Sequence, residues 1–145
     1  MEIKIQYLDD TIEPLGFVEG EKSDWIDLRA AMDYRLKAGE HKLIHLGVAM
    51  QLPEGYEAVI APRSSTFKKW GILQPNSPGV VDESYCGPDD WWFMSAYATR
   101  DITIAKGSRI CQFRIQKKMG RDVTFTQVDK LENENRGGHG STGDK

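Results

Sequence analysis

The apolar residues of this chain recur mostly at every second position, and this period constrains the fold more than any other feature of the sequence. A period of two fits a β-strand with one buried face, whereas an amphipathic helix needs a period of about 3.6. The strand-like runs are short and numerous, covering residues 1–7, 24–34, 41–50, 56–61, 102–104, 109–115 and 123–128. Many short strands at regular spacing predict an all-β domain, either a sandwich or a barrel.

Turns, one short helix and a terminal arm complete the predicted plan. Turns are expected at residues 52–55 and 106–108, which are rich in Gly, Pro and polar residues. Residues 64–70 make a short helix plausible, with Ser64 or Ser65 able to cap its N-terminus and Gly71 ending it. From about Lys130 the chain becomes polar and Gly-rich, so we expect a β-domain over residues 1–130 and a flexible arm over residues 131–145.

The net charge of the chain limits the kinds of partner that it could bind, and its cysteines indicate the compartment in which it is expected. The net charge of −3 argues against a nucleic-acid-binding protein, because affinity for a polyanion needs a basic surface. A few local cations would still bind a small anionic ligand. Cys86 and Cys111 lack metal-type spacing and are expected to be reduced thiols, with a disulfide as the less favoured alternative. No apolar run approaches about 18 residues, so we expect a cytoplasmic protein without a membrane partner.

Two segments have the chemistry of phosphate binding. Residues 136–143 combine four glycines with an arginine and two hydroxyls, and such a segment offers bare N–H groups and a forked cation to an anion. Residues 61–65 place an arginine and two serines where a strand ends and a helix begins, which also suits a phosphate. The alternatives are an unstructured polar terminus for the first segment and simple helix capping for the second.

Residues 76–85 suggest a site for a base and a sugar. A buried β-hairpin with Asn and Gly at its bends could present backbone N–H and C=O groups to a base edge. Asp82 follows two valines and is a candidate general base at the end of a mostly buried strand. Tyr85 could stack on a sugar ring and leave no room for a 2′-hydroxyl. The alternative is an ordinary Asp-rich turn in which Tyr85 serves only for packing.

Two further polar residues are placed on apolar strands. Gln112 should be partly buried, and its amide could hold a water molecule or be satisfied within the core. Asp27 lies near a strand end and could hold waters of a Mg²⁺ ion, or it could be a turn carboxylate.

In this order, the segments resemble the five motifs of the homotrimeric dUTPase family, the deoxyuridine triphosphate nucleotidohydrolases. The matching stretches are residues 23–30, 62–71, 79–87, 107–112 and 136–143. The resemblance implies a distorted β jelly roll and a homotrimer with active sites shared between subunits, over which the C-terminal arm of a neighbour closes. It also implies Mg²⁺-dependent hydrolysis of dUTP to dUMP and pyrophosphate by attack of water on the α-phosphorus. That reaction keeps uracil out of DNA and supplies dUMP for dTMP synthesis.

The same resemblance implies a role for each matching residue. Asp82 would be the general base, Gln112 would help to hold the water, and Tyr85 would exclude ribonucleotides. Asp27 would be an outer-shell carboxylate near the metal. The remaining substrate contacts would be Asn76 with the backbone of Gly79, Val80, Val81 and Asp82 for uracil, Arg63, Ser64 and Ser65 for phosphate, and Arg136, His139, Gly140, Ser141 and Thr142 from the arm.

The sequence departs from the family pattern at two places, and we expect the two departures to be related. Many members have an aromatic residue where this chain has His139, and Tyr85 is followed here by the unusual run 86–93, Cys-Gly-Pro-Asp-Asp-Trp-Trp-Phe. This resembles the branch found in Bacillus-like bacteria and their phages. We expect Phe93, or failing that Trp92, to cover the uracil ring, with core or interface packing as the alternative for these aromatic residues.

Two other functions compete with this interpretation. A dCTP deaminase shares the fold and an Arg-Ser-Ser string, but the hairpin around Asp82 and the Gly-Ser-Thr arm argue against it. Loss of Asp82 or Arg136 would favour a dUTPase-fold module whose main role is to bind a regulatory protein, but both residues are present. The complete set of motifs argues against a loss of catalysis and leaves a second, regulatory role open.

Overall fold

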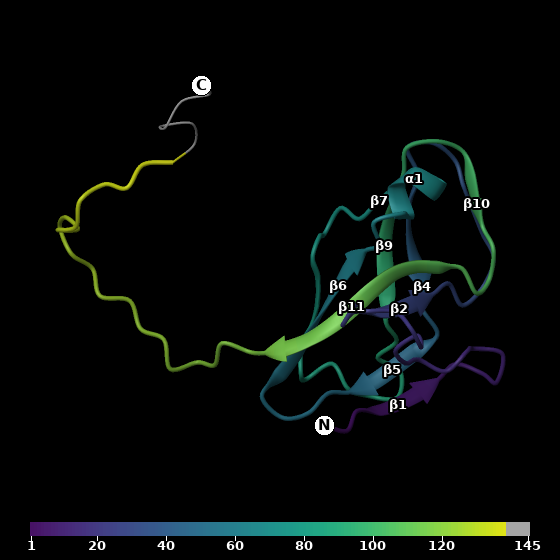
Figure 1. The fold of residues 1–145 in the computed structure, drawn as a ribbon, viewed down its shortest axis with the longest axis horizontal. Helices are drawn as coiled ribbons and strands as arrows, with labels where there is room; N and C mark the ends of the chain where they lie inside the picture. The colour runs from purple at the N-terminus through teal and green to yellow at the C-terminus, as the bar shows by residue number, and fades with distance from the viewer. Residues whose placement is uncertain (139–145) are drawn as a thin grey trace.

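Within residues 1–138, which are the residues that the structure describes, the computed structural model folds into four antiparallel sheets and one short helix (Figure 1). The largest sheet has the order β2 (Ile26–Arg29), β11 (Arg109–Lys117), β6 (Tyr56–Pro62) and β8 (Gly79–Val81). The second has the order β4 (His41–His45), β9 (Phe93–Ala98) and β7 (Ile72–Leu73). Two pairs complete the fold, β1 (Lys4–Tyr7) with β5 (Val48–Gln51), and β10 (Ile102–Ile104) with β3 (Tyr34–Leu36). The prediction of an all-β chain is confirmed.

One predicted strand is divided, and the strands β3, β7 and β9 were not expected as such. The expected strand over residues 41–50 is split into β4 and β5, because the chain turns at Gly47 with a φ of 71°. A Cβ on Gly47 would come within 2.8 Å of the Ile12 side chain, so this turn requires glycine. Strand β9 was not expected, because small residues such as Ala96 and Ala98 carry its buried face while Phe93 and Tyr97 face outward.

The core lies between the sheets and follows the two-residue period. Its largest fully buried side chains are Trp92, Leu28, Leu36, Ile44, Leu46, Ile72, Met94, Ile104 and Ile110. Trp92 packs edge-on against Phe113, with 5.1 Å between the ring centroids. Burying a large aromatic side chain contributes roughly 2–3 kcal/mol, so Trp92 is part of what holds the sheets together.

The short helix α1 (Thr66–Trp70) forms where the sequence predicts it. Ser65 is the N-cap residue, but its hydroxyl makes no capping bond. Instead, the Thr66 hydroxyl accepts a hydrogen bond from the backbone N–H of Arg63 at 2.9 Å and donates one to the Ile110 carbonyl at 3.0 Å. Gly71 ends the helix in the left-handed region. Within the described residues no helix is long and apolar enough to cross a membrane.

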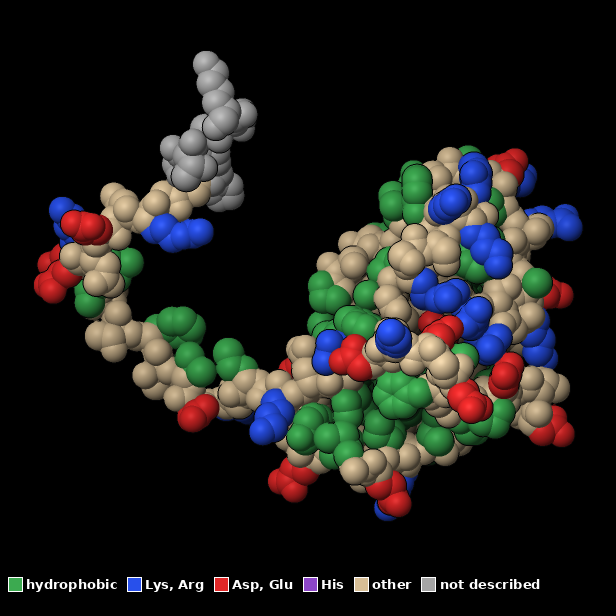
Figure 2. Space-filling view, in the orientation of Figure 1, with side chains coloured by type: hydrophobic (Ala, Val, Ile, Leu, Met, Phe, Trp, Pro, Cys, Tyr) green, Lys and Arg blue, Asp and Glu red, His purple; other side chains and the backbone are tan. Residues whose placement is uncertain are grey.

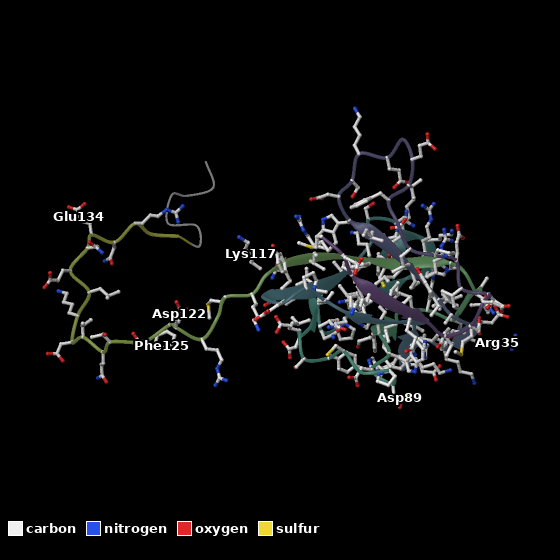
Figure 3. All side chains as sticks on the ribbon, turned by 90° about the horizontal axis from the view of Figure 1, so that it is seen from below. Arg35, Asp89, Lys117, Asp122, Phe125 and Glu134 are labelled. Carbon is white, nitrogen blue, oxygen red and sulfur yellow. The ribbon has the colours of Figure 1, made fainter. Side chains whose placement is uncertain are left out.

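The chain leaves the sheets after Lys118, whose backbone N–H donates to the Gly55 carbonyl at 2.9 Å. Residues 119–138 then extend away from the body (Figures 1 and 3). The prediction of a strand over residues 123–128 was wrong, since the structure has no strand there. An alternating run becomes a strand only beside a partner strand, and Phe125 is 95% exposed in this single chain.

Candidate active site

The predicted site residues that belong to the sheets form two groups at opposite ends of β6. In the ladder with β8, Ala58 lies opposite Val81, so Asp82 follows at the Glu57 end. Arg63 comes directly after Pro62, at the other end of the strand. The six positions from 57 to 63 span roughly 20 Å at the rise of a β-strand.

At the first end of β6 is a pocket of about 230 Å³, which we call the Asp82 pocket. Its lining residues are Val80, Val81, Asp82, Tyr85, Trp91, Trp92 and Phe93. The Tyr85 hydroxyl donates a hydrogen bond to the Trp91 carbonyl at 2.7 Å, which fixes the phenol at the pocket wall. Burial, together with the nearby Asp90 carboxylate, raises the pKa of Tyr85, so the phenol stays protonated and keeps donating.

Asp82 is exposed and follows the buried Val81, as the sequence predicts. Its carbonyl accepts a hydrogen bond from the Tyr85 N–H at 3.0 Å, closing the turn that carries both side chains. Among the described residues, none forms a hydrogen bond or ion pair with its carboxylate. The carboxylate is therefore free to accept a proton from a bound molecule.

Of the two aromatic residues proposed to cover a base, only Phe93 presents its ring. Phe93 is 38% exposed, whereas Trp92 is 1% exposed and belongs to the core. Pocket and exposed ring together offer an apolar face to a flat ligand.

At the other end of β6, a carboxylate joins two arginines in what we call the Asp27 cluster. Asp27 Oδ1 lies 3.0 Å from Arg63 Nε, and Asp27 Oδ2 lies 3.1 Å from Arg109 Nη1. Arg109 also approaches Glu21 at 3.7 Å. Figure 2 shows Lys and Arg side chains gathered over the neighbouring region of α1, β2 and β11. The arrangement holds two planar cations in place, which suits the recognition of phosphate groups.

Arg109 was given no role in the sequence analysis. It lies 82 residues from Asp27 in the chain and reaches it because β2 pairs with β11. An arginine three positions before Gln112 was the available signal, but only the strand pairing shows which carboxylate it meets.

Gln112 lies between the two neighbouring strands of the Asp27 cluster. It is opposite Asp27 on β2 and Ala61 on β6, and it is half-buried, as the sequence predicts. Its amide donates to the Pro62 carbonyl at 3.1 Å. No described residue donates a hydrogen bond to its amide oxygen, so an acceptor remains available.

The residues around Asn76 are arranged differently from the prediction. The expected hairpin does not form, because β7 pairs with β9 while β8 pairs with β6. The buried Gln74 supports the connecting loop through a hydrogen bond from its amide to the Ile60 carbonyl at 2.9 Å. Asn76 is exposed in that loop, Ser64 is exposed, and Ser65 is half-buried at the start of α1. Arg136 is exposed on the extended segment, and His139, Gly140, Ser141 and Thr142 lie outside the described residues.

The carboxylates do not form a metal cage. Within residues 1–138, no group of three or more His, Cys, Asp or Glu residues could hold a metal ion. Both oxygens of Asp27 already face guanidinium groups, which leaves the residue suited to bond a metal-bound water rather than the ion itself. Mg²⁺ commonly keeps its waters and binds through substrate phosphates, so these residues fit an ion that arrives with a phosphorylated ligand.

Comparison with known proteins gives a consistent result. The dUTPase family model matches residues 21–143. The chain is 59% identical over 145 residues to the SPbeta prophage-derived deoxyuridine 5′-triphosphate nucleotidohydrolase YosS of Bacillus subtilis, covering 100% of both chains. It is 37% identical to a deoxyuridine 5′-triphosphate nucleotidohydrolase of Rickettsia prowazekii, covering 99% of this chain and 97% of the relative.

Solved structures resemble the model over most of its length. A variant of the dUTPase from phage phi11 of S. aureus, described with a structural Mg(II) ion, has a TM-score of 0.74 at 16% identity, covering 92% of this chain and 100% of its own. The dUTPase from Streptococcus mutans has a TM-score of 0.73 at 23% identity, covering 85% and 100%. This likeness confirms the predicted jelly-roll fold.

Proposed function

Because this chain belongs to the dUTPase family, we propose that it hydrolyses dUTP to dUMP and pyrophosphate by attack of water on the α-phosphorus. The observation that carries this proposal is the Asp82 pocket. It places an unpaired carboxylate beside an apolar cavity of about 230 Å³ with an exposed aromatic ring at its wall. The removal of dUTP keeps uracil out of DNA and supplies dUMP for dTMP synthesis, and we place the reaction in the cytoplasm.

The pocket holds the base and the sugar. Phe93 covers the uracil ring, while the backbone of residues 79–82 and the exposed Asn76 meet the polar edge of the base. Tyr85 lies under the deoxyribose and excludes a 2′-hydroxyl, because its hydrogen bond to the Trp91 carbonyl prevents the phenol from moving aside.

Asp82 acts as the general base. A positioned base contributes typically ~10²–10⁴ in rate when it lies within hydrogen-bond reach of the proton that it removes. Gln112 holds the same water through its free amide oxygen. The rest of the rate comes from orientation and from cations that meet the charge developing on the phosphates.

The site requires more than one copy of the chain. Continuing the β6 ladders, Asp82 lies opposite position 57 and Gln112 opposite position 61, about 13 Å apart along the strands. Because β8 and β11 lie on opposite sides of β6, the two residues are also about 10 Å apart across the sheet, which separates their backbones by about 16 Å. Two side chains that hold one water must both lie within about 3 Å of it. We therefore assign Asp82 and Gln112 of each site to neighbouring subunits of a homotrimer.

The arm completes the site. The arm and the segment of residues 119–130 that leads to it carry exposed apolar residues, among them Val123, Phe125 and Leu131. Nothing in the described part of a single chain covers these side chains, and they would be buried against a neighbouring subunit. This docking would bring Arg136, Ser141 and Thr142 to the γ-phosphate, with His139 and Gly140 as further substrate contacts. We propose residues 131–145 as the arm that closes over a neighbouring site and residues 1–130 as the jelly-roll domain, whose last strand ends at Lys117.

The phosphates lie at the Asp27 cluster. Arg63 donates to them from a guanidinium that Asp27 orients, and Ser64 and Ser65 add short donors at the start of α1. Mg²⁺, when bound, neutralises triphosphate charge. Asp27 keeps both arginines in place and would hold the ion by accepting a hydrogen bond from one of its waters.

Pyrophosphate release from dUTP, dCTP, dTTP and UTP tests the proposal, for the wild type and for Asp82→Asn, with Mg²⁺ and with excess EDTA. We expect release from dUTP alone, lost in the variant and in EDTA. Ammonia release from dCTP would instead indicate a deaminase, and no reaction with any nucleotide would refute the enzymatic assignment.

A further inference from the structure

His45, the last residue of β4, lies behind the exposed aromatic wall of the Asp82 pocket. It is directly opposite Phe93 in the β4–β9 ladder. Its ring centroid is 4.9 Å from that of Phe93 at an interplanar angle of 68°, an edge-on contact. The ring centroid of Trp91 lies 5.4 Å away at 45°. One imidazole therefore contacts two of the aromatic residues that line the pocket.

The position of His45 is fixed by its backbone on both sides. Its N–H donates to the Tyr34 hydroxyl at 2.8 Å, and its carbonyl accepts from the Ala31 N–H at 2.8 Å. Tyr34 begins β3, and Ala31 follows β2, so two other parts of the fold hold this residue.

The ring of His45 is fixed as well. Its Nδ1 accepts a hydrogen bond from the Gly47 N–H at 2.9 Å, which requires an unprotonated Nδ1. Burial lowers the pKa of His45, and this favours the neutral ring that the bond needs. The turn at Gly47 thus determines where the imidazole plane lies, and the imidazole plane supports the two neighbouring rings.

We propose that His45 is a positioning residue for the nucleobase, holding Phe93 and Trp91 as a preformed wall of the Asp82 pocket. The inference rests on the proposed function, since it assumes that this pocket takes the uracil base. His45 does not line the Asp82 pocket, whereas Phe93 and Trp91 do, so it would act on the ligand only through these two rings. Its effect therefore falls on binding and spares the chemical step.

Loss of the His45 ring should therefore affect KM and not kcat. An aromatic contact is worth about 0.5–1.5 kcal/mol, which corresponds to roughly two- to tenfold in affinity. Loss of the ring frees the Phe93 side chain to occupy other rotamers, so each binding event must order it again. KM and Kd should rise while kcat stays nearly constant.

Two variants separate the ring from its hydrogen bond. His45→Asn keeps an acceptor near the Gly47 N–H but removes the ring, whereas His45→Phe keeps a ring and removes the acceptor. The matched control is His41→Asn, on the same outward face of β4, where the Nε2 contacts Ser95 Oγ at 2.7 Å away from the pocket. Kd for a non-hydrolysable α,β-imido analogue of dUTP is measured by calorimetry, beside kcat and KM for dUTP and thermal unfolding of each variant.

We expect His45→Asn to raise Kd and KM about three- to tenfold with kcat within about twofold, and His45→Phe and His41→Asn to stay within about twofold of wild type. Unchanged Kd in His45→Asn, or an equal rise in His41→Asn, would overturn the role of His45. So would a fall in kcat without a change in KM. If His45→Asn does not fold, His45→Leu carries the same expectation. A wild type that neither binds the analogue nor hydrolyses dUTP would instead refute the proposed function, and the role of His45 with it.

Discussion

The two ends of β6 differ in how their carboxylates are paired. At the Asp82 pocket, a single unpaired carboxylate stands beside aromatic rings, and no described charge opposes it. In the Asp27 cluster, the carboxylate is shared by two guanidinium groups at 3.0 and 3.1 Å. The Asp82 carboxylate is available to accept a proton. The Asp27 carboxylate is paired, and the two guanidinium groups that it orients are suited to bind an anion.

This contrast separates activity from stability. Asp82 contributes no described ion pair to the folded chain, so changing it should affect chemistry alone. Asp27 is only 16% exposed and joins β2 to Arg109 at the start of β11 and to Arg63 just after β6, so changing it should affect the fold as well. The two carboxylates are therefore distinguishable by experiment although both are predicted site residues.

The largest effect is expected from Asp82→Asn. Removal of the base should lower kcat for dUTP by about 10²- to 10⁴-fold, with the melting temperature unchanged, because the side chain has no partner to lose. Steady-state pyrophosphate release measures this, and Asp89→Asn, in the exposed loop labelled in Figure 3, is the matched control. Activity comparable to wild type would remove Asp82 from the mechanism.

Arg63→Ala comes next in magnitude. A hydrogen bond to a charged group contributes about 1.5–3 kcal/mol, so kcat/KM for dUTP should fall by roughly 10- to 100-fold. Arg63→Ala should also weaken the binding of dUMP, but by a smaller factor than it lowers kcat/KM for dUTP, because dUMP lacks the outer phosphates. Equal losses for both ligands would place Arg63 away from the outer phosphates.

Asp27→Asn should have a smaller effect, seen mainly in stability. Two partly exposed ion pairs are lost, and at about 0.2–1 kcal/mol each they lower the free energy of unfolding by about 1 kcal/mol. Urea unfolding at low and high salt measures the change, which should shrink as salt screens the pairs. An unfolding midpoint identical to wild type at low salt would show that the cluster carries no stability.

The smallest expected effect is a difference in thiol reactivity between the two cysteines. Cys86 is exposed next to the Asp82 pocket, whereas Cys111 is buried beside Gln112, and burial raises the pKa of the Cys111 thiol. A thiol reagent should modify one cysteine in the native protein and two in denaturant. Modification of Cys111 in the native state would mean that the β2–β11 sheet opens.

The sequence predicted local features well and distant pairings poorly. Asp82, Tyr85 and Phe93 lie within twelve residues of one another, and the structure places all three at one pocket. The helix at residues 66–70 and the glycine that ends it were likewise set by local chemistry.

What the sequence could not predict depends on which strands are neighbours. The pairing of Arg109 with Asp27 follows from the β2–β11 ladder, and the wrong hairpin around Asn76 follows from β7 and β8 joining different sheets. The run at residues 123–128 alternates like a strand but pairs with no strand within residues 1–138. Alternation predicts that a segment can pair, but it does not say with what.

We propose that the two ends of β6 meet only between subunits, and mixed trimers test this directly. Asp82→Asn and Arg63→Ala, each with impaired activity alone, are refolded together in equal amounts, and activity is measured at a dUTP concentration at which Arg63→Ala alone stays below about a tenth of wild type. If each site takes Asp82 from one copy and Arg63 from the next, about a quarter of the sites in a random ring of three are intact, and dUTPase activity should recover to about that fraction of wild type. If both residues serve a site within one chain, every site carries a defect, and a mixture no more active than its parents would contradict the claim.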